Sequence, residues 1–501
     1  MERKYHTLPQ ARVDIDCSGA DGEFTRYRHV ISHGGINNFP LPPKVSRGLA
    51  ALKPRLVRTF IQEYFHNMDN PDKEYDWSLL DPYLESLAVN GAKIVACICV
   101  KPPALFPAKD QRIFMPNDIK RWQNFIAAMV NRYTVEKQWV EYWEIGNETD
   151  IGETGGCPYL MDTPEKYIAY YTITAEAIKS AAPDAKIGGP AVANPRHGLV
   201  EGLLKHCRSA GLPLDFISWH VYSDDPAQHA AHANHILPLI KKYYPDSPPE
   251  TMVTEFGKGF DSVCVEESAF DGYRAAAVMS CVFAMMETGV DYTFYYHIWD
   301  QVFLADQFAG FFEEPEIMLT HWDSIPHRMG MFGVCEEARP VYSAYRLLGM
   351  MGGARLGAKS SQADLRVVAA SAKVDPHVAV ASPQADLRGV AVAEGANDIH
   401  CVNCSGGTIK AMLVNYNLQQ SHDLVARVNF NGIQDGPKLL TVYRADPSYA
   451  SGDIEQAPRP TEKRYVDARG GFYCNIYCPA DSVSLVCIEP TTEDAIRKNY
   501  L

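Results

Sequence analysis

The segment SLLDPYLESLAVNGAKIVACICV (residues 78–100) joins two patterns that together indicate the fold. Its first part places Leu80, Leu84 and Leu87 on one face of a helix, and Gly91 follows as a stop signal. Its second part, AKIVACICV (92–100), is almost wholly apolar, as expected of a parallel strand buried on both faces. The segment therefore predicts a helix that leads directly into a buried strand.

The same alternation of strand and helix patterns extends over residues 26–352. Eight β-type runs occur there, at 27–32, 56–61, 92–100, 140–146, 185–192, 215–222, 251–256 and 291–299. Helical patterns separate them, with Asn117 and Thr163 as expected N-caps of two of the helices. This organisation predicts an α/β fold, a (β/α)8 TIM barrel. A doubly wound open sheet is the alternative, but no Gly-rich phosphate turn follows the first strand.

The remainder of the chain has a different pattern. Residues 353–501 contain short strand-like runs separated by Gly, Pro, Asn and Asp, which predicts a C-terminal all-β sandwich module. The pentapeptide QADLR occurs at 362–366 and again at 384–388, which suggests two related hairpin strands. Within residues 1–25, the run ARVDIDC is expected to add a strand to this module.

Composition excludes several classes of function. The 501 residues carry 47 Lys and Arg against 61 Asp and Glu, a net charge of −14, so a basic surface for nucleic acid or anionic membrane is not expected. There is no run of about 18 uncharged apolar residues, the length that a membrane span needs. The N-terminal residues lack the apolar stretch of a secretory signal, so we expect a cytoplasmic protein.

The 13 cysteines are scattered through apolar stretches and are expected to be free core thiols in a reducing compartment. Two pairs come nearest to metal-ligand spacing, Cys401 with Cys404 and Cys474 with Cys478, but no His lies at ligand spacing beside the second pair. We therefore expect neither a metal nor a cofactor.

In a TIM barrel the active site lies at the carboxyl ends of the strands, and several polar side chains occur at those ends here. Asn147 and Glu148 end the fourth run in WEIGNE, and Glu255 ends the seventh in VTEF. Five further candidates come from the second, sixth and eighth runs: Arg58, His220, Tyr222, Tyr296 and Trp299.

Two carboxyl groups that flank a sugar C–O bond suffice for glycoside hydrolysis. Strands four and seven lie across the barrel, so Glu148 and Glu255 can approach to about 5–5.5 Å, the separation that a retaining mechanism needs. In that scheme Glu255 forms a covalent glycosyl-enzyme, while Glu148 acts first as acid and then as base. Arg58 near Glu255 would keep the nucleophile ionised. Glu144 and Asp150 are weaker competitors for the acid role.

At these residues the chain resembles clan A glycoside hydrolases, and most closely family 39, the β-xylosidases and α-L-iduronidases. The phrases that carry the resemblance run in order: LVR (56–58), KPP (101–103), WEIGNE (143–148), KIGGPAV (186–192), LDFISWHVYS (214–223), VTEF (253–256) and RPVYSAYRLLGMMG (339–352). The resemblance implies that Glu148 is the acid/base, that Glu255 is the nucleophile and that Asn147 binds the sugar 2-hydroxyl. It further implies that His220 and Tyr222 orient the nucleophile and the sugar, and it makes a homo-oligomer possible.

The sequence departs from the family pattern around the sugar. Phe60 stands where family members usually have His, and Gly257, Lys258 and Gly259 follow the nucleophile in place of Asn-Thr or Asn-Ser. Tyr296 falls at the position of a Trp, and Leu304 with Ala305 replaces an acidic pair. These departures affect groups that hold sugar hydroxyls and leave the two-glutamate chemistry intact.

The sequence therefore predicts a retaining glycoside hydrolase that acts on small β-linked glycosides, exo-acting and β-xylosidase-like, with carbohydrate as its partner. Two alternatives stay open. One is a non-catalytic carbohydrate-binding barrel protein, and the other is an endo-acting clan A polysaccharide hydrolase.

Overall fold

The structure is a computed structural model. It describes residues 8–20, 22–25, 29–34, 39–61, 75–259, 267–301, 309, 312–317, 329–362, 364–372, 407–445, 454, 458–469 and 471–494. The chain forms two compact units. One comprises residues 27–345 and 447–457, and the other comprises residues 1–26, 346–446 and 458–501.

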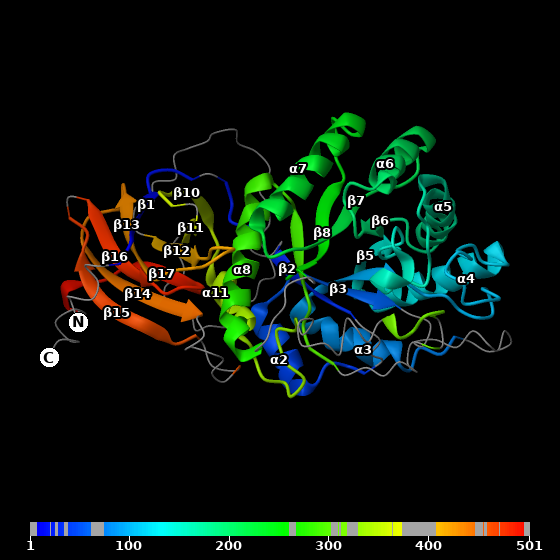
Figure 1. Ribbon diagram of the computed structural model, residues 1–501, viewed down its shortest axis with the longest axis horizontal. Helices are drawn as coiled ribbons and strands as arrows, with labels where there is room; N and C mark the ends of the chain where they lie inside the picture. Colours follow the sequence, from blue (N-terminus) through cyan, green and yellow to red (C-terminus); the bar gives the residue numbers. More distant parts are fainter. Residues whose placement is uncertain are drawn as a thin grey trace. The chain divides into compact units, whose positions relative to one another are not determined.

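The first unit is a closed barrel of eight parallel strands, and it confirms the predicted TIM barrel (Figure 1). The strands follow in chain order: β2 (His29–His33), β3 (Leu56–Ile61), β4 (Lys93–Ile98), β5 (Val140–Ile145), β6 (Lys186–Val192), β7 (Phe216–Tyr222), β8 (Glu250–Gly257) and β9 (Tyr292–Tyr296). β2 pairs with β9 and closes the ring, which excludes the open sheet. Closure brings the ends of β5 and β8 to the same mouth of the barrel.

Helices connect successive strands and cover the barrel from outside (Figure 1). They are α2 (Pro43–Leu52), α3 (Leu80–Leu87), α4 (Ile119–Val130), α5 (Pro164–Ala181), α6 (Gly198–Ala210), α7 (Pro226–Tyr243), α8 (Glu267–Thr288) and α11 (Pro340–Met350), with the short turns η3 (Val89–Gly91), η4 (Asn131–Glu136) and η5 (Gly152–Gly155). Thr163 is the N-cap of α5, as predicted. The predicted cap Asn117 is wrong, because the side chain of Asp118 accepts the N–H of Arg121 and caps α4.

The barrel interior changes from apolar to charged along the strands. Its amino-terminal half is filled by Val30, Leu56, Val95, Tyr142, Phe216, Met252, Tyr292 and Phe294. Side chains two residues apart on a strand share a face. Arg58 and Glu144 therefore follow Leu56 and Tyr142 into the next layer, toward the mouth. Both are fully buried, so the polar layer lies on a closed apolar floor.

The second unit is a nine-stranded, mostly antiparallel sheet (Figure 1). Its strands are β1 (Gln10–Asp16), β10 (Ala354–Ser360), β11 (Leu365–Ala372), β12 (Thr408–Asn415), β13 (Leu424–Asn431), β14 (Pro437–Ala445), β15 (Pro460–Asp467), β16 (Phe472–Cys478) and β17 (Ser482–Pro490). β1 runs antiparallel to β10 and parallel to β13. Side chains from nearly all of these strands share one apolar core.

The cysteines of the described residues are free, and most are buried. Cys474 and Cys478 are among them, and burial raises the pKa of each thiol to about 12. Cys401, Cys404 and the second QADLR copy lie outside the described residues.

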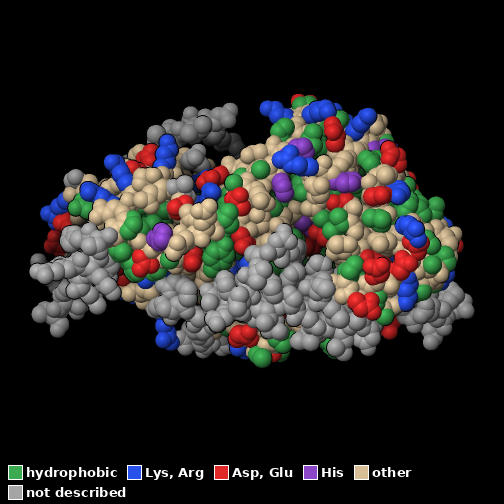
Figure 2. Space-filling model, viewed as in Figure 1, with side chains coloured by type: hydrophobic (Ala, Val, Ile, Leu, Met, Phe, Trp, Pro, Cys, Tyr) green, Lys and Arg blue, Asp and Glu red, His purple; other side chains and the backbone are tan. Residues whose placement is uncertain are grey.

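The surface agrees with the charge composition. On the face shown in Figure 2, Lys and Arg side chains are interspersed with Asp and Glu side chains and do not form one continuous basic surface. Among the described residues, every helix is too short or too polar to cross a membrane.

Candidate active site

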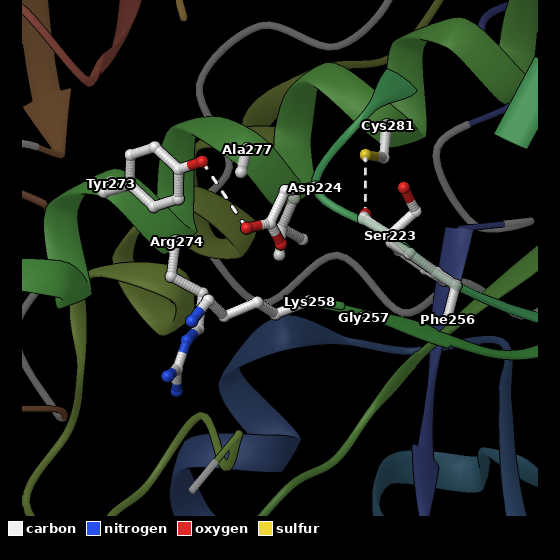
Figure 3. A pocket seen from close by; sticks show the side chains of 10 residues that line it. Ser223, Asp224, Phe256, Gly257, Lys258, Tyr273, Arg274, Ala277 and Cys281 are labelled. Carbon is white, nitrogen blue, oxygen red and sulfur yellow. Dashed lines mark hydrogen bonds between the residues drawn. The ribbon is translucent and has the colours of Figure 1, made fainter. Parts of the chain in front are cut away.

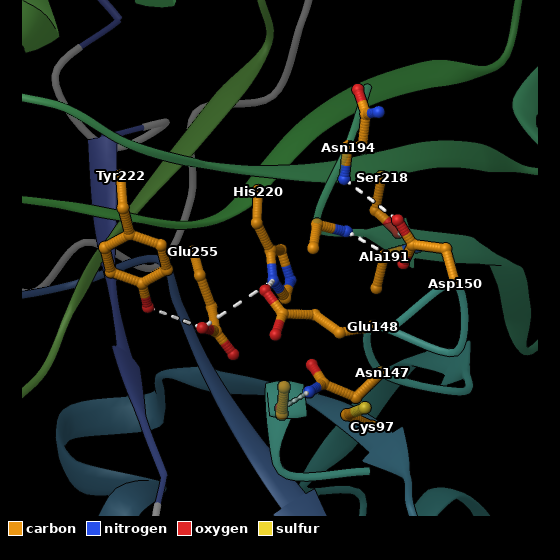
Figure 4. A network of polar contacts seen from close by, with 12 residues as sticks. Cys97, Asn147, Glu148, Asp150, Ala191, Asn194, Ser218, His220, Tyr222 and Glu255 are labelled. Atoms are coloured by element: carbon orange, nitrogen blue, oxygen red, sulfur yellow. Dashed lines mark hydrogen bonds and ion pairs between the residues drawn. The ribbon is translucent and has the colours of Figure 1, made fainter. Parts of the chain in front are cut away.

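Glu148 and Glu255 face each other at the mouth of the barrel (Figure 4). Glu148 follows β5, and Glu255 belongs to β8. A carboxylate oxygen of each and a ring nitrogen of His220 all lie within 4.8 Å of one another. Glu148 is 8% exposed and Glu255 is 5% exposed, so the two carboxyl groups share a largely water-excluded space.

Arg58 connects the two sides of this site. Its guanidinium is fully buried, donates from Nε to Glu144 at 2.7 Å and contacts Glu255 through Nη1. Its Nη2 donates to the side-chain oxygen of Asn147 at 2.7 Å. The planar fork of an arginine suits three such partners at once, and no other side chain offers that geometry. The ring of Phe60 lies 4.7 Å from the guanidinium carbon and covers one face of it.

His220 and Tyr222 on β7 contact different glutamates. The Tyr222 hydroxyl donates to Oε2 of Glu255 at 2.6 Å. His220 Nδ1 lies 2.7 Å from Oε1 of Glu148 and 3.7 Å from Oε2 of Glu255, so it contacts Glu148 more closely than Glu255. Burial lowers the pKa of His220, and Arg58 lowers it further, so the imidazole is neutral at neutral pH. Its Nε2 has no hydrogen-bond partner in the described part of the chain.

The electrostatics of the two glutamates differ. Burial raises the pKa of Glu148 far above its ordinary value, and the nearby Glu255 raises it further. Burial also raises the pKa of Glu255, but Arg58 and the Tyr222 hydrogen bond act in the opposite direction. Two carboxylates this close cannot both ionise easily. Of the two, Glu148 therefore holds its proton more tightly than Glu255.

The other predicted residues take varied positions. Asn147 is buried, and its amide nitrogen donates to the carbonyl of Gly155 at 3.2 Å, so the protein engages both its polar atoms. The ring of Tyr296 packs edge-on against Tyr222 with centroids 6.4 Å apart, beside the carboxyl pair. Trp299 is only partly buried, and its backbone forms an isolated bridge with Phe332. No contact among the described residues brings Trp299 to the two glutamates.

The segment after Glu148 holds residues that the sequence did not single out as part of the site. Asp150, considered there only as a competing acid, accepts the N–H groups of Ala193 and Asn194 at 3.0 and 2.9 Å. Gly155 lies so close to Glu148 that a Cβ built on it would come within 2.1 Å of Oε2. The GGP of residues 188–190 and the Gly-rich run 152–156 are the sequence signals that could have drawn attention to these close approaches.

The trio Glu148, His220 and Glu255 has donor atoms close enough to share a metal ion. However, the Arg58 guanidinium already contacts Glu255, and a buried cation so near would repel a second one. The arrangement therefore suits acid–base and nucleophilic chemistry better than metal binding.

Residues 56–387 match Glycosyl hydrolases family 39, which is more than half of the chain. The chain belongs to glycosyl hydrolases family 39. A β-xylosidase from Geobacillus stearothermophilus is 27% identical over 198 residues, and the alignment covers 36% of each chain. The α-L-iduronidase of Homo sapiens is 29% identical over 117 residues, 20% of this chain and 17% of the relative. The alignments thus span little more than a third of the β-xylosidase and about a sixth of the α-L-iduronidase.

Solved structures show the family 39 fold over nearly the whole chain. A monomeric β-xylosidase from Caulobacter crescentus superposes with a TM-score of 0.68, covering 96% of this chain and 100% of that one, at 17% identity. At this identity the likeness concerns the fold, that is, the barrel together with a second, mostly antiparallel sheet.

Two cavities lie among the segments that follow the barrel strands. The first, in Figure 3, lies behind the ends of β7 and β8, between Asp224, Lys258 and Tyr273 among others. At about 10 Å³ it holds at most one water molecule, so it is no substrate site. The second, of about 440 Å³, is lined by Ala108–Asp110 after β4 and by Phe312, Glu313 and Pro315 after β9. Its size falls in the range of small-molecule sites.

Proposed function

We propose that the protein is a retaining glycoside hydrolase that removes single sugars from small β-linked glycosides, as a β-xylosidase-like exo-glycosidase. The observation that carries the proposal is the pairing of Glu148 with Glu255, whose carboxylate oxygens lie within 4.8 Å of each other in a buried pocket. This separation fits a retaining mechanism, because an inverting pair must leave room for a water molecule between the carboxyl groups.

In the first step, the ionised Glu255 attacks the anomeric carbon of the sugar. The bond from that carbon to the glycosidic oxygen breaks, and Glu148 gives its proton to the departing oxygen. Arg58 and Tyr222 favour the ionised form of Glu255 at this stage. The raised pKa of Glu148 keeps its proton available at neutral pH.

In the second step, Glu148 has lost its proton and acts as a base. It takes a proton from a water molecule, whose oxygen attacks the anomeric carbon and displaces Glu255. Neutral His220 suits both stages, because an imidazole can donate to an ionised carboxylate or accept from a protonated one. Because Nε2 has no hydrogen-bond partner among the described residues, either tautomer of the His220 ring is accessible.

The choice of a β-xylosidase-like activity rests on the Geobacillus relative and on the resemblance of the sequence to the β-xylosidases of the family. The iduronidase alternative is weaker, because no basic residue follows His220 on β7 to meet a uronate carboxylate.

Chemical rescue tests the assignment of both glutamates. Glu255→Gly is expected to abolish hydrolysis of aryl β-glycosides, and azide should restore turnover with the α-glycosyl azide as product, since azide then enters from the vacated face. Glu148→Ala with azide should give the β-glycosyl azide instead. Glu165→Ala, an exposed carboxylate in α5, serves as the control and should behave as wild type. Full activity of Glu255→Gly would reject the proposal.

A non-catalytic carbohydrate-binding role is the second candidate, favoured by Phe60 lying against Arg58 where the family usually has His. Binding of glycans in calorimetry, without hydrolysis across a broad panel of exo and endo substrates, would support it. Release of products longer than one sugar from a polysaccharide would instead support endo action.

A further inference from the structure

Glu148 has an unusual backbone conformation for the residue that carries the acid–base chemistry. Its φ is +43°, in the left-handed region that non-glycine residues rarely adopt. Such a conformation is strained, and it persists only where its surroundings hold it. The contacts that hold Glu148 therefore decide where its carboxyl group points.

The backbone N–H of Glu148 donates to the carbonyl oxygen of Ala191 at 2.8 Å. Ala191 is itself left-handed, with φ +50°, and fully buried. It is the extra residue of a bulge in β6, because Pro190 pairs with Ser218 on β7 and Val192 pairs with Trp219. A bulge residue loses its place in the ladder, so its N–H needs another partner.

Ser218 supplies that partner. Its hydroxyl oxygen accepts the N–H of Ala191 at 3.0 Å, in a fully buried position on β7 (Figure 4). His220, two residues further along the same strand, contacts the carboxyl group of Glu148. One strand thus holds Glu148 at two points, through its side chain by His220 and through its backbone by way of Ala191.

A second connection runs parallel to the first. The carboxylate of Asp150 accepts the N–H groups of Ala193 and Asn194, two and three residues beyond the bulge. The carbonyl of Glu148 accepts from Ile151 and Gly152, which closes a tight turn between these two connections. The segments after β5 and β6 are therefore fixed to each other on both sides of the turn.

We propose that Ser218 is a positioning residue for the acid–base group. By holding the bulge at Ala191, it keeps Glu148 in its left-handed conformation and sets the place of its carboxyl group opposite Glu255. The inference rests on the proposed function, since it assigns a task to Ser218 in the glycosidase reaction. It concerns proton transfer and not the nucleophile.

The test compares two aryl β-glycosides of the sugar that the wild type hydrolyses. One has a 2,4-dinitrophenyl leaving group, which needs little protonation to depart, and the other has an unactivated phenol, which needs a proton from Glu148. In Ser218→Ala, kcat/KM for the unactivated substrate should fall by on the order of 100-fold, as for a misplaced catalytic group. The value for the dinitrophenyl substrate should change much less.

The ratio of the two values is the decisive readout, because it does not depend on how much of the sample is folded. Ser218→Thr keeps the hydroxyl and should restore the ratio toward that of the wild type. Ser280→Ala, which removes a buried hydroxyl from α8, is the matched control and should leave the ratio unchanged. An equal loss for both substrates in Ser218→Ala, or no loss, would overturn the inference.

Two further measurements keep the outcome clear. If Ser218→Ala does not fold, Asp150→Asn, which weakens the second connection, should skew the ratio in the same direction. If the wild type hydrolyses no glycoside, the proposed function has failed. A crystal structure of Ser218→Ala then gives the position of Glu148. If Glu148 has not moved and its N–H still donates to Ala191, the positioning role is rejected.

Discussion

Tyr222 donates a hydrogen bond to Glu255 at 2.6 Å, from the strand beside the one that carries the proposed nucleophile. A donor to an ionised carboxylate stabilises the charged form and lowers its pKa. We therefore expect Tyr222→Phe to raise the pKa of Glu255. The acidic limb of the profile of kcat/KM against pH should move to higher pH, because Glu255 would take up its proton earlier as the pH falls.

The loss of a hydrogen bond to a charged group corresponds to about 1.5–3 kcal/mol, so the activity of Tyr222→Phe at neutral pH should fall roughly 10- to 100-fold. Tyr171→Phe is the control, since its hydroxyl donates to the carbonyl of Pro213 away from the carboxyl pair. An unmoved acidic limb in Tyr222→Phe would contradict the role of the hydroxyl.

Glu144→Gln should shift the same limb in the opposite direction. Glu144 shares Arg58 with Glu255, and its negative charge raises the pKa of Glu255. Without that charge, Arg58 acts on Glu255 alone, so the pKa of Glu255 should fall and activity should extend to lower pH. The measurement is the pH profile of kcat/KM for the dinitrophenyl glycoside. A shift to higher pH would show that Glu144 does not act through charge.

Arg58→Met should destabilise the fold as well as the reaction. It leaves Glu144 and Glu255 buried without their cation, which typically costs 3–5 kcal/mol. Urea denaturation should show this as a lower free energy of unfolding. Arg112→Met removes a surface ion pair with Asp110 and should change the free energy of unfolding little. Equal stability of the two variants would argue that the Glu144–Arg58–Glu255 group is not held by charge.

Gly155→Ala should impair catalysis. The new methyl group would come within 2.1 Å of Oε2 and 2.6 Å of Cβ of Glu148, so the whole Glu148 side chain must move. We expect kcat for aryl glycosides to fall on the order of 100-fold, as for displacement of a catalytic group by about 1 Å. Gly198→Ala, whose Cβ has its nearest neighbour at 4.0 Å, is the control. Wild-type kcat in Gly155→Ala would mean that Glu148 tolerates this shift.

Glu153→Gln should loosen the wall of the larger cavity. The two oxygens of Glu153 accept the N–H groups of Glu313 and Glu314, at 2.7 and 3.0 Å. A glutamine offers only one acceptor oxygen, so one N–H would lose its partner. Hydrogen exchange at residues 313 and 314 should accelerate. Exposed Glu165→Gln should leave this exchange unchanged, and unaltered exchange in Glu153→Gln would refute this bonding.

The sequence predicted those features that depend on local pattern. The run 56–61 coincides with β3, because it is short and combines apolar with β-branched residues, a composition that favours a strand. The meeting of Glu148 with Glu255 could be anticipated because both end strands of one closed barrel. The barrel pattern requires helices between the strands, but the positions of α2, α6 and α7 were not predicted. The predicted cap of α4 is wrong by one residue, as happens where several capping residues adjoin.

The supporting contacts could not be predicted in the same way. The bulge at Ala191 depends on the register between β6 and β7, and the contact of His220 with Glu148 depends on where that bulge turns the chain. Both are set by pairing between strands and leave no periodic signal in the sequence. The roles assigned to the eight predicted site residues stay predictions until the variants are measured.

The shared guanidinium has a consequence for the thermal tolerance of the molecule. Arg58 is the cation in contact with Glu144 and Glu255, while Glu148 stands beside them with a raised pKa. Such a carboxyl group binds its proton more tightly in the folded state than in the unfolded state. Its contribution to the free energy of unfolding therefore falls as the pH rises above the ordinary glutamate range. Relief of that crowding by Glu148→Gln should give a more stable protein, so selection for heat resistance alone would tend to remove the proposed acid–base group.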